Sequence, residues 1–172
     1  MADRKARIER KTNETDIVVE MNLDGQGRYE IDTGVGFFDH MLTHLSKHSK
    51  IDMTVKAKGD LEIDAHHTIE DVGICIGEAL CEALRDKKGI ARYGNSAVPM
   101  EDAKAIVTVD LSGRPFLVYK AGFPSEKIGE FDTECVEEFL QSFSTVGKFN
   151  LHIEVPYGAN SHHIAEALRY AD

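Results

Sequence analysis

The chain has 172 residues, 42% of them hydrophobic, and a formal net charge of −10 at pH 7. This length and apolar content are sufficient for one compact core, and the acidic balance argues against a nucleic-acid-binding protein. No stretch approaches the roughly 18 apolar residues of a membrane span, and the N-terminus lacks the apolar segment of a signal peptide. The three cysteines, Cys75, Cys81 and Cys135, have no C-x-x-C spacing. They indicate reduced thiols, so we expect a cytoplasmic protein.

The first half of the chain predicts a series of strands interrupted by two helices. Residues 1–13 are polar and basic and lead into an expected strand over residues 17–23, whose apolar side chains alternate. Asp24 and Gly25 predict a hairpin turn, with a returning partner strand over residues 28–32. The apolar periodicity then predicts a helix, a strand, a short strand and a second helix, over residues 37–48, 51–57, 61–63 and 68–85.

The second half repeats the order of the first. Its expected elements are two strands, a helix, and a further strand before a short last helix, over residues 105–111, 115–119, 129 to about 145, and 149–155. Two half-repeats, residues 1–94 and 95–172, therefore form one compact domain. We expect an α+β fold with internal duplication. Each half is a small four-stranded, mostly antiparallel sheet with two helices on one face, and helices of both halves pack as an inner layer.

One pattern, His-His-x-x-Glu, opens or precedes the last helix of each half. Its copies are His66, His67 and Glu70, and His162, His163 and Glu166. A single pair of adjacent histidines is typical of a solvated surface, but a second copy with the same spacing favours metal binding. Adjacent helical residues point about 100° apart, so one ion cannot easily take all three groups of one motif. Two motifs suit two shared ions, and imidazole with carboxylate suits Mn, Fe, Zn, Co or Ni.

The alignment of the two halves adds one residue to each motif. Pairing Ile51 with Phe149 without gaps places Glu138 opposite His40, on the helix upstream of each motif. Four protein ligands for each of two octahedral ions, with positions left open for substrate, are chemically sensible. The eight candidate metal ligands are therefore His40, His66, His67, Glu70, Glu138, His162, His163 and Glu166.

At this point several runs resemble one family, the imidazoleglycerol-phosphate dehydratases of histidine biosynthesis. The runs are GVGFFDHML at residues 34–42, GDLEIDAHHTIED at residues 59–71 and DLSGRP at residues 110–115, completed by Ser161, His162, His163, Glu166 and Ala167. The resemblance covers nearly the whole chain, from about Arg7 to Ala167, and the runs occur in the family's order.

The resemblance implies a lyase that removes water from D-erythro-imidazoleglycerol phosphate and gives imidazoleacetol phosphate. It implies two Mn²⁺ ions per subunit, held between subunits by the eight candidate ligands, and a homo-oligomer of 24 subunits built from trimers. Many members have histidine where this chain has Glu138, and glutamate is an acceptable hard ligand there. The only other partner expected is the small phosphorylated imidazole substrate, with neither nucleic acid nor membrane.

The resemblance also assigns residues to the reaction. It implies catalytic roles for Glu14, His48, Glu70 and Glu166. The substrate contacts that it implies are Glu14, His40, His48, His66, His67, Arg92, Arg114 and His162. A planar guanidinium fork suits phosphate, which is the expected role of the two arginines. From the residues alone, Glu14 is typical of an exposed strand end, and each arginine of a surface position.

Two other functions stay open at this point. A binuclear metallohydrolase also uses histidine and glutamate clusters, but usually with bridging aspartates that the motifs lack. The second is a catalytically impaired, metal-dependent assembly subunit, because the family's C-terminal Ser-x-Lys segment at the phosphate is missing from the 172 residues. The dehydratase is favoured because the ligand set, Glu14 and both arginines are all present.

Overall fold

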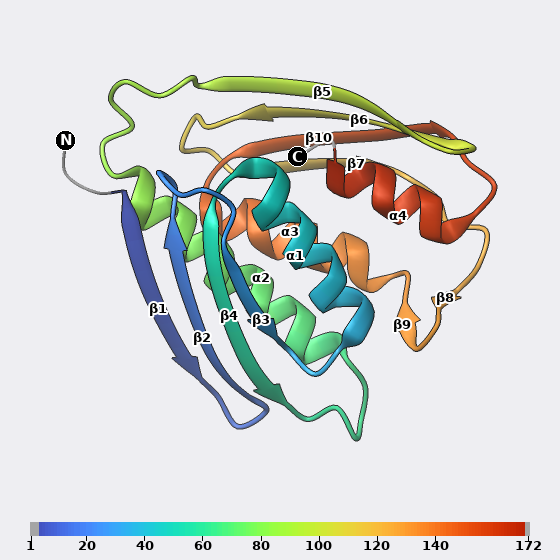
Figure 1. Cartoon of the computed structure of the whole chain (residues 1–172), viewed down its shortest axis with the longest axis horizontal. Coiled ribbons are helices and arrows are strands. Elements are labelled where there is room, and N and C mark those ends of the chain that lie inside the picture. The colour runs from blue at the N-terminus through green and yellow to red at the C-terminus, as the bar shows by residue number, and fades with distance from the viewer. Residues whose placement is uncertain (1–3, 171–172) are drawn as a thin grey trace.

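Two four-stranded sheets enclose a layer of helices in the computed structural model (Figure 1). It describes the backbone of residues 4–170 and the side chains of residues 4–168. Within residues 4–170, none of the helices has the length and hydropathy that a bilayer crossing requires.

The first half forms one sheet with two helices on its inner face. The strand order is β1 (Lys5–Lys11), β2 (Thr15–Asn22), β4 (Asp52–Gly59) and β3 (Tyr29–Asp32). The first three strands pair antiparallel, and β3 runs parallel to β4. The helices are α1 (Gly36–Ser49) and α2 (His66–Leu84). Alternate side chains of β2, such as Ile17 and Val19, are buried beneath them, as the period of two requires.

The second half has the same arrangement. Its sheet has the order β5 (Tyr93–Met100), β6 (Ala103–Asp110), β10 (Asn150–Tyr157) and β7 (Phe116–Lys120), and its helices are α3 (Cys135–Gly147) and α4 (Ser161–Tyr170). Only β7 is parallel to its neighbour, β10. A small hairpin, β8 (Lys127–Ile128) and β9 (Phe131–Asp132), precedes α3. The predicted α+β fold of two similar halves is confirmed.

The first helix of each half packs against the second helix of the other half. In the centre of the layer α2 lies on α3, and α1 contacts α4 (Figure 1). Glycines on α2 allow the close approach of α3. A Cβ on Gly73 would lie 2.9 Å from the carbonyl oxygen of Phe139, and one on Gly77 would lie 2.7 Å from that of Phe143. This packing brings side chains from the two halves to the same places.

The prediction for the strand after the first turn was wrong. We expected residues 28–32 to return as a hairpin beside residues 17–23, but β3 pairs in parallel with β4 instead. The reason is that β2 already has β1 on one side and β4 on the other. The backbone N–H groups of Gln26 and Arg28 bind Asp52 Oδ1 at the start of β4, which carries the chain past that strand.

Three further segments differ from the prediction. Residues 61–63 form a turn rather than a strand, in which the Ile63 N–H donates to the Asp60 carbonyl (2.9 Å). The fourth strand is instead β1 in the first sheet and β5 in the second, and both are edge strands. The apolar alternation is hidden in β1 by its charged residues and in β5 by Gly94 and Pro99. The helix expected from residue 129 begins at Cys135, because Phe131 and the residue after it pair within the β8–β9 hairpin.

Candidate metal centre

Both His-His-x-x-Glu motifs lie in the first turns of helices. The first motif opens α2 and the second opens α4. Each start is fixed by a side chain two residues upstream. Asp64 Oδ1 accepts the backbone N–H of His66, and Asn160 Oδ1 accepts that of His162, each at 2.8 Å. The duplicated motif therefore has a duplicated turn in front of it.

Three of the predicted ligands meet where α1 contacts α4. Glu166 Oε1 lies 3.3 Å from His40 Nε2 and 3.7 Å from His162 Nε2. The glutamate side chain is 10% exposed, and the Phe37 ring lies against the His162 ring with 5.3 Å between centroids. Both histidines also line a cavity of about 820 Å³, together with residues 34–37, 61, 64–65 and 127–132. This cluster has two ring nitrogens directed at one carboxylate oxygen.

The second histidine of each motif points elsewhere. The rings of His66 and His67 are at 89° to each other, and so are those of His162 and His163. His67 Nδ1 lies 2.9 Å from Asp60 Oδ2, and His163 Nδ1 contacts Asp102 Oδ1.

These contacts change the acid–base character of both partners. The hydrogen bond that His67 donates to Asp60 raises the pKa of His67, and the negative charge of Glu14 adds to the shift. The hydrogen bond from His163, with backbone donors, lowers the pKa of Asp102 to about 2. A carboxylate that accepts Nδ1–H leaves Nε2 with the lone pair that a metal ion requires.

Glu14, His67 and Glu70 line a second cavity, of about 200 Å³. Asp71 also lines this cavity and accepts hydrogen bonds from Arg10 Nε (3.0 Å) and Thr15 Oγ1 (2.5 Å). The Glu14 carboxylate makes no hydrogen bond or ion pair with any described residue. It is exposed and next to a histidine, which is the position of a group that can exchange protons.

The structure does not bring all eight predicted ligands into one group. Within the described residues, no three His, Cys, Asp or Glu side chains are arranged to hold a metal ion without further ligands. Glu138 makes no hydrogen bond or ion pair with another predicted ligand there. The donor set itself fits a metal such as manganese, because imidazole nitrogens face a carboxylate and no thiolate is nearby. A complete set of metal ligands is therefore not present among the described residues of one chain.

The remaining predicted residues lie on α1 and at one end of the second sheet. His40, His44 and His48 form a column along α1, with ring centroids 4.5 Å and then 5.8 Å apart. Arg92 forms a two-point contact with Asp110, Nε to Oδ1 at 2.6 Å and Nη2 to Oδ2 at 3.1 Å. Arg114 is exposed in the turn between β6 and β7. The pair with Asp110 holds the Arg92 fork beside the turn that carries Arg114.

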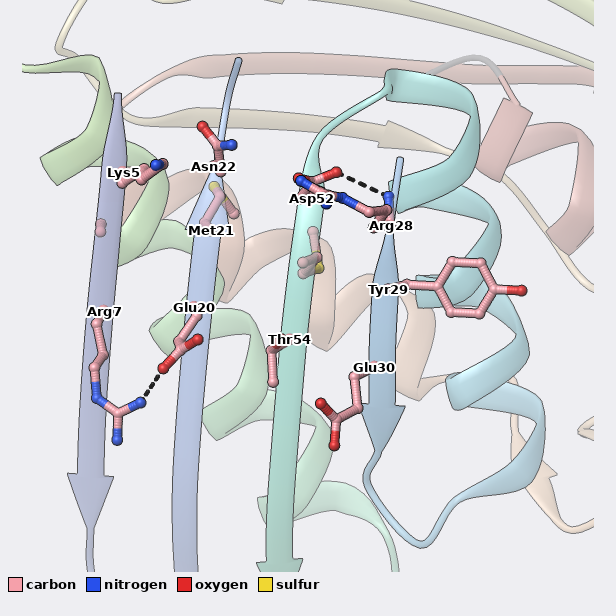
Figure 2. A pocket seen from close by; sticks show the side chains of 12 residues that line it. Lys5, Arg7, Glu20, Met21, Asn22, Arg28, Tyr29, Glu30, Asp52 and Thr54 are labelled. Atoms are coloured by element: carbon pink, nitrogen blue, oxygen red, sulfur yellow. Dashed lines mark hydrogen bonds and ion pairs between the residues drawn. The ribbon is translucent and has the colours of Figure 1, made fainter. Parts of the chain in front are cut away.

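A large cavity elsewhere contains none of the predicted residues. It has a volume of about 630 Å³ and lies on the outer face of the first sheet (Figure 2). Four of its charged side chains form two ion pairs, Arg7 with Glu20 and Arg28 with Asp52. This cavity is therefore separate from the site that the sequence predicts.

The sequence reasoning missed Asp60, Asp102 and Asp110. Asp60 and Asp110 lie inside the runs that carried the family resemblance, but nothing in their spacing shows that they hold a histidine and an arginine. Asp102 lies directly before β6, as Glu14 lies directly before β2. The repeat could therefore have identified Asp102 as the equivalent of Glu14, if the starts of both strands had been predicted.

Known proteins resemble the chain over most of its length. A sequence model described as imidazoleglycerol-phosphate dehydratase matches residues 33–171. Proteins of that name from Cereibacter sphaeroides (strain ATCC 17029) and Ruegeria pomeroyi are each 59% identical over 164 residues, which cover 95% of this chain and 84% of the relative.

Solved structures agree. The imidazoleglycerol-phosphate dehydratase of Staphylococcus aureus N315 superposes with a TM-score of 0.88 at 40% identity, over 97% of this chain and 92% of the other. The Pyrococcus furiosus protein, solved in complex with (S)-C348, gives 0.82 at 35% identity, over 95% and 88%. The fold, the duplicated motif and these relatives lead to one conclusion: the chain belongs to the imidazoleglycerol-phosphate dehydratase family.

Proposed function

We propose that this chain is a manganese-dependent imidazoleglycerol-phosphate dehydratase of histidine biosynthesis. The dehydratase activity follows from the family and its close relatives. The dependence on manganese is supported by one observation, the convergence of His40 and His162 on Glu166 at the start of a His-His-x-x-Glu helix.

The duplication suggests how the ligands divide between two ions per subunit. His40, His162 and Glu166 lie together, and their repeat equivalents are Glu138, His66 and Glu70. Each set has one residue from α1 or α3, with the first histidine and the glutamate of a motif. The second histidines, His67 and His163, contact Asp60 and Asp102 instead, and are suited to complete the set of another copy. This division requires neighbouring subunits and agrees with a homo-oligomer, for which we propose trimers assembled into a 24-mer.

The chain's own residues can do the remaining chemistry. Dehydration removes a hydroxyl next to the imidazole ring and a proton from the neighbouring carbon, and the enol so formed becomes the ketone of imidazoleacetol phosphate. Bound manganese would act as a Lewis acid and hold the substrate in place. Glu14 is the proton-transfer group, because its carboxylate is exposed and makes no hydrogen bond among the described residues. Arg92 and Arg114 carry the positive charge for the phosphate, and His48 extends the α1 column to the substrate.

Neither alternative function has a specific observation in its favour. A catalytically impaired assembly subunit would need defects in the catalytic set, yet Glu14, His67 and Glu70 share one cavity. The three cysteines, all within the described residues, form no disulfide. This state supports the cytoplasmic location that we propose.

The test is formation of imidazoleacetol phosphate from imidazoleglycerol phosphate by the full chain with Mn²⁺. We expect turnover, and we expect His162→Ala to remove almost all of it. His152→Ala is the matched control, because His152 is exposed on β10 and outside the motif. Equal turnover by wild type and His162→Ala would contradict the proposed metal site, and no turnover by wild type with bound Mn²⁺ would support the impaired assembly subunit.

A further inference from the structure

The two carboxylates that hold the second histidines come from different parts of the two halves. Asp60 follows β4 directly and binds His67, whereas Asp102 precedes β6 directly and binds His163. Halves that arose by duplication would be expected to use the same position. The difference has a local cause in the second half.

The second half has no room for an equivalent of Asp60. The residue directly after β10 is Gly158, and a Cβ there would lie 2.5 Å from Ile164 Cγ1 and 3.1 Å from Ala103 Cβ. The connection from β10 to α4 is also shorter than the one from β4 to α2, residues 158–160 against residues 60–65. A side chain at the position equivalent to Asp60 would therefore clash, and Asn160 in this connection instead accepts the backbone N–H groups of His162 and His163.

In the second half the carboxylate that contacts His163 belongs to Asp102, which occupies the repeat position of Glu14. Both residues directly precede the second strand of their sheet, β2 or β6. Asp102 is fully engaged, because Oδ2 accepts the N–H groups of Ala159 (2.6 Å) and Asn160 (3.0 Å) while Oδ1 contacts His163. The Glu14 carboxylate makes no such hydrogen bonds among the described residues, because His67 already has Asp60 as its partner. One turn thus carries a fixed carboxylate and its repeat carries an exposed one.

The surroundings of Asp60 indicate that this residue is placed for its contact with His67. Its side chain is 14% exposed, and its Oδ1 atom is buried with no hydrogen-bond partner among the described residues. A buried carboxylate oxygen without a partner costs free energy, so a residue placed only for folding would have both oxygens satisfied. The contact from Oδ2 to His67 is what this position supplies.

We propose that Asp60 and Asp102 are positioning residues that fix the second histidine of each motif with Nε2 available to a metal ion. We further infer that the use of Asp60 in the first half leaves Glu14 available for proton transfer. Only one of the two repeat-related turns then supplies an acid–base group. This inference rests on the proposed function, because it assigns residues that act through the ligands of that site.

The test measures Mn²⁺ affinity of the full-length protein by competition with a fluorescent chelator. We expect Asp60→Ala and Asp102→Ala to weaken Mn²⁺ binding about 10- to 100-fold, the usual effect of removing a carboxylate behind a ligating histidine. Asp60→Asn should recover most of the loss, since its amide oxygen still accepts the Nδ1–H. The matched control is Asp52→Ala, which removes a carboxylate that, like Asp102, accepts two backbone N–H groups. Asp52 lines the cavity that contains none of the predicted site residues.

A second readout separates positioning from catalysis. Glu14→Gln should lose turnover and keep wild-type Mn²⁺ affinity, whereas Asp102→Ala should lose affinity and regain turnover at saturating Mn²⁺. If Asp102→Ala fails to fold, Asp60→Ala and Asp60→Asn decide. Wild-type affinity in a folded Asp60→Ala would overturn this inference and leave the proposed function intact. Absence of both Mn²⁺ binding and turnover in the wild type would overturn the proposed function and this inference together.

Discussion

At the residue scale, the geometry separates side chains that hold from side chains that react. Asp60, Asp102 and Asp110 each contact a histidine or arginine that the family resemblance assigns to the site. Glu14 lines the same cavity as His67, and its carboxylate makes no hydrogen bond with any described residue. A proton-transfer group must be accessible to substrate, and a positioning group must not move, so the two kinds of carboxylate require different surroundings.

Glu14→Gln tests the reactive carboxylate. The amide has nearly the same shape but cannot accept and release a proton, so we expect turnover at saturating substrate to fall about 10²- to 10⁴-fold. Glu9→Gln is a suitable control, because Glu9 lies on β1, the strand before the turn that carries Glu14, and among the described residues it pairs with Arg7. Steady-state kinetics with Mn²⁺ present measures both. A Glu14→Gln enzyme with wild-type turnover would assign proton transfer to another group.

Asp52 gives a pH-dependent prediction away from the site. Hydrogen bonds from Arg28 and from the backbone of Gln26 hold the pKa of Asp52 well below its ordinary 3.8. The folded state therefore favours the charged form, so the contribution to stability is fully present above pH 3.8 and is lost as the pH falls toward the folded pKa.

The experiment compares urea midpoints of wild type and Asp52→Asn, both stripped of metal, as the pH is lowered from 6. We expect wild type to be more stable at pH 6 and the difference to shrink below pH 3.8. A difference that does not change with pH would show that the Arg28–Asp52 pair, which Figure 2 displays, has no part in acid stability.

At the element scale, the contact of α2 with α3 controls where the first motif lies. Gly77 permits that contact, since an added Cβ would meet the Phe143 carbonyl oxygen at 2.7 Å and the Gly147 nitrogen at 2.9 Å. Both neighbours are backbone atoms and cannot rotate away. We expect Gly77→Ala to destabilise the fold by about 1–3 kcal/mol, despite the higher helix propensity of alanine.

Urea denaturation of Gly77→Ala checks this prediction, with Gly122→Ala as control. A Cβ on Gly122 would meet no atom within 4 Å, so that variant should keep wild-type stability. If Gly77→Ala were as stable as wild type, the helices would have to separate at little cost. The close packing would then not be what sets the position of α2.

The elements also show how far the sequence alone can predict this fold. Apolar periodicity located α1, α2, β2, β4, β6 and β10, because each buries one face. It missed β1 and β5, which are edge strands with little apolar alternation. It also assigned β3 to the wrong neighbour. Pairing of β3 depends on which edges other strands occupy, and a local pattern contains no information about that.

The site was predictable to a similar extent. Spacing and the repeat selected His40, His162 and Glu166, and the structure places these three together. The family resemblance, rather than any spacing, selected Glu14 and the arginines. The carboxylates behind the histidines were not predicted, because Asp102 reaches His163 across 61 residues and only the folded chain shows that contact.

At the scale of the whole molecule, one chain contains only parts of the proposed metal centres. Three of the proposed ligands meet at α1 and α4, while His67 and His163 contact Asp60 and Asp102. Neighbouring subunits would supply the missing ligands, so bound metal and assembly should depend on each other. Chelation should therefore reduce the size of the oligomer, and added Mn²⁺ should restore it. Size-exclusion chromatography with light scattering measures this, and an oligomer of unchanged mass without metal would contradict shared sites.

The central claim is that two metal ions per chain, held by the duplicated motif, make this protein a dehydratase. The most direct test is to strip the protein with a chelator and follow the turnover of imidazoleglycerol phosphate while Mn²⁺ is added back. We expect no product from the stripped protein and a rise that reaches its plateau at two Mn²⁺ per chain. Full turnover by protein shown to contain no metal would contradict the claim.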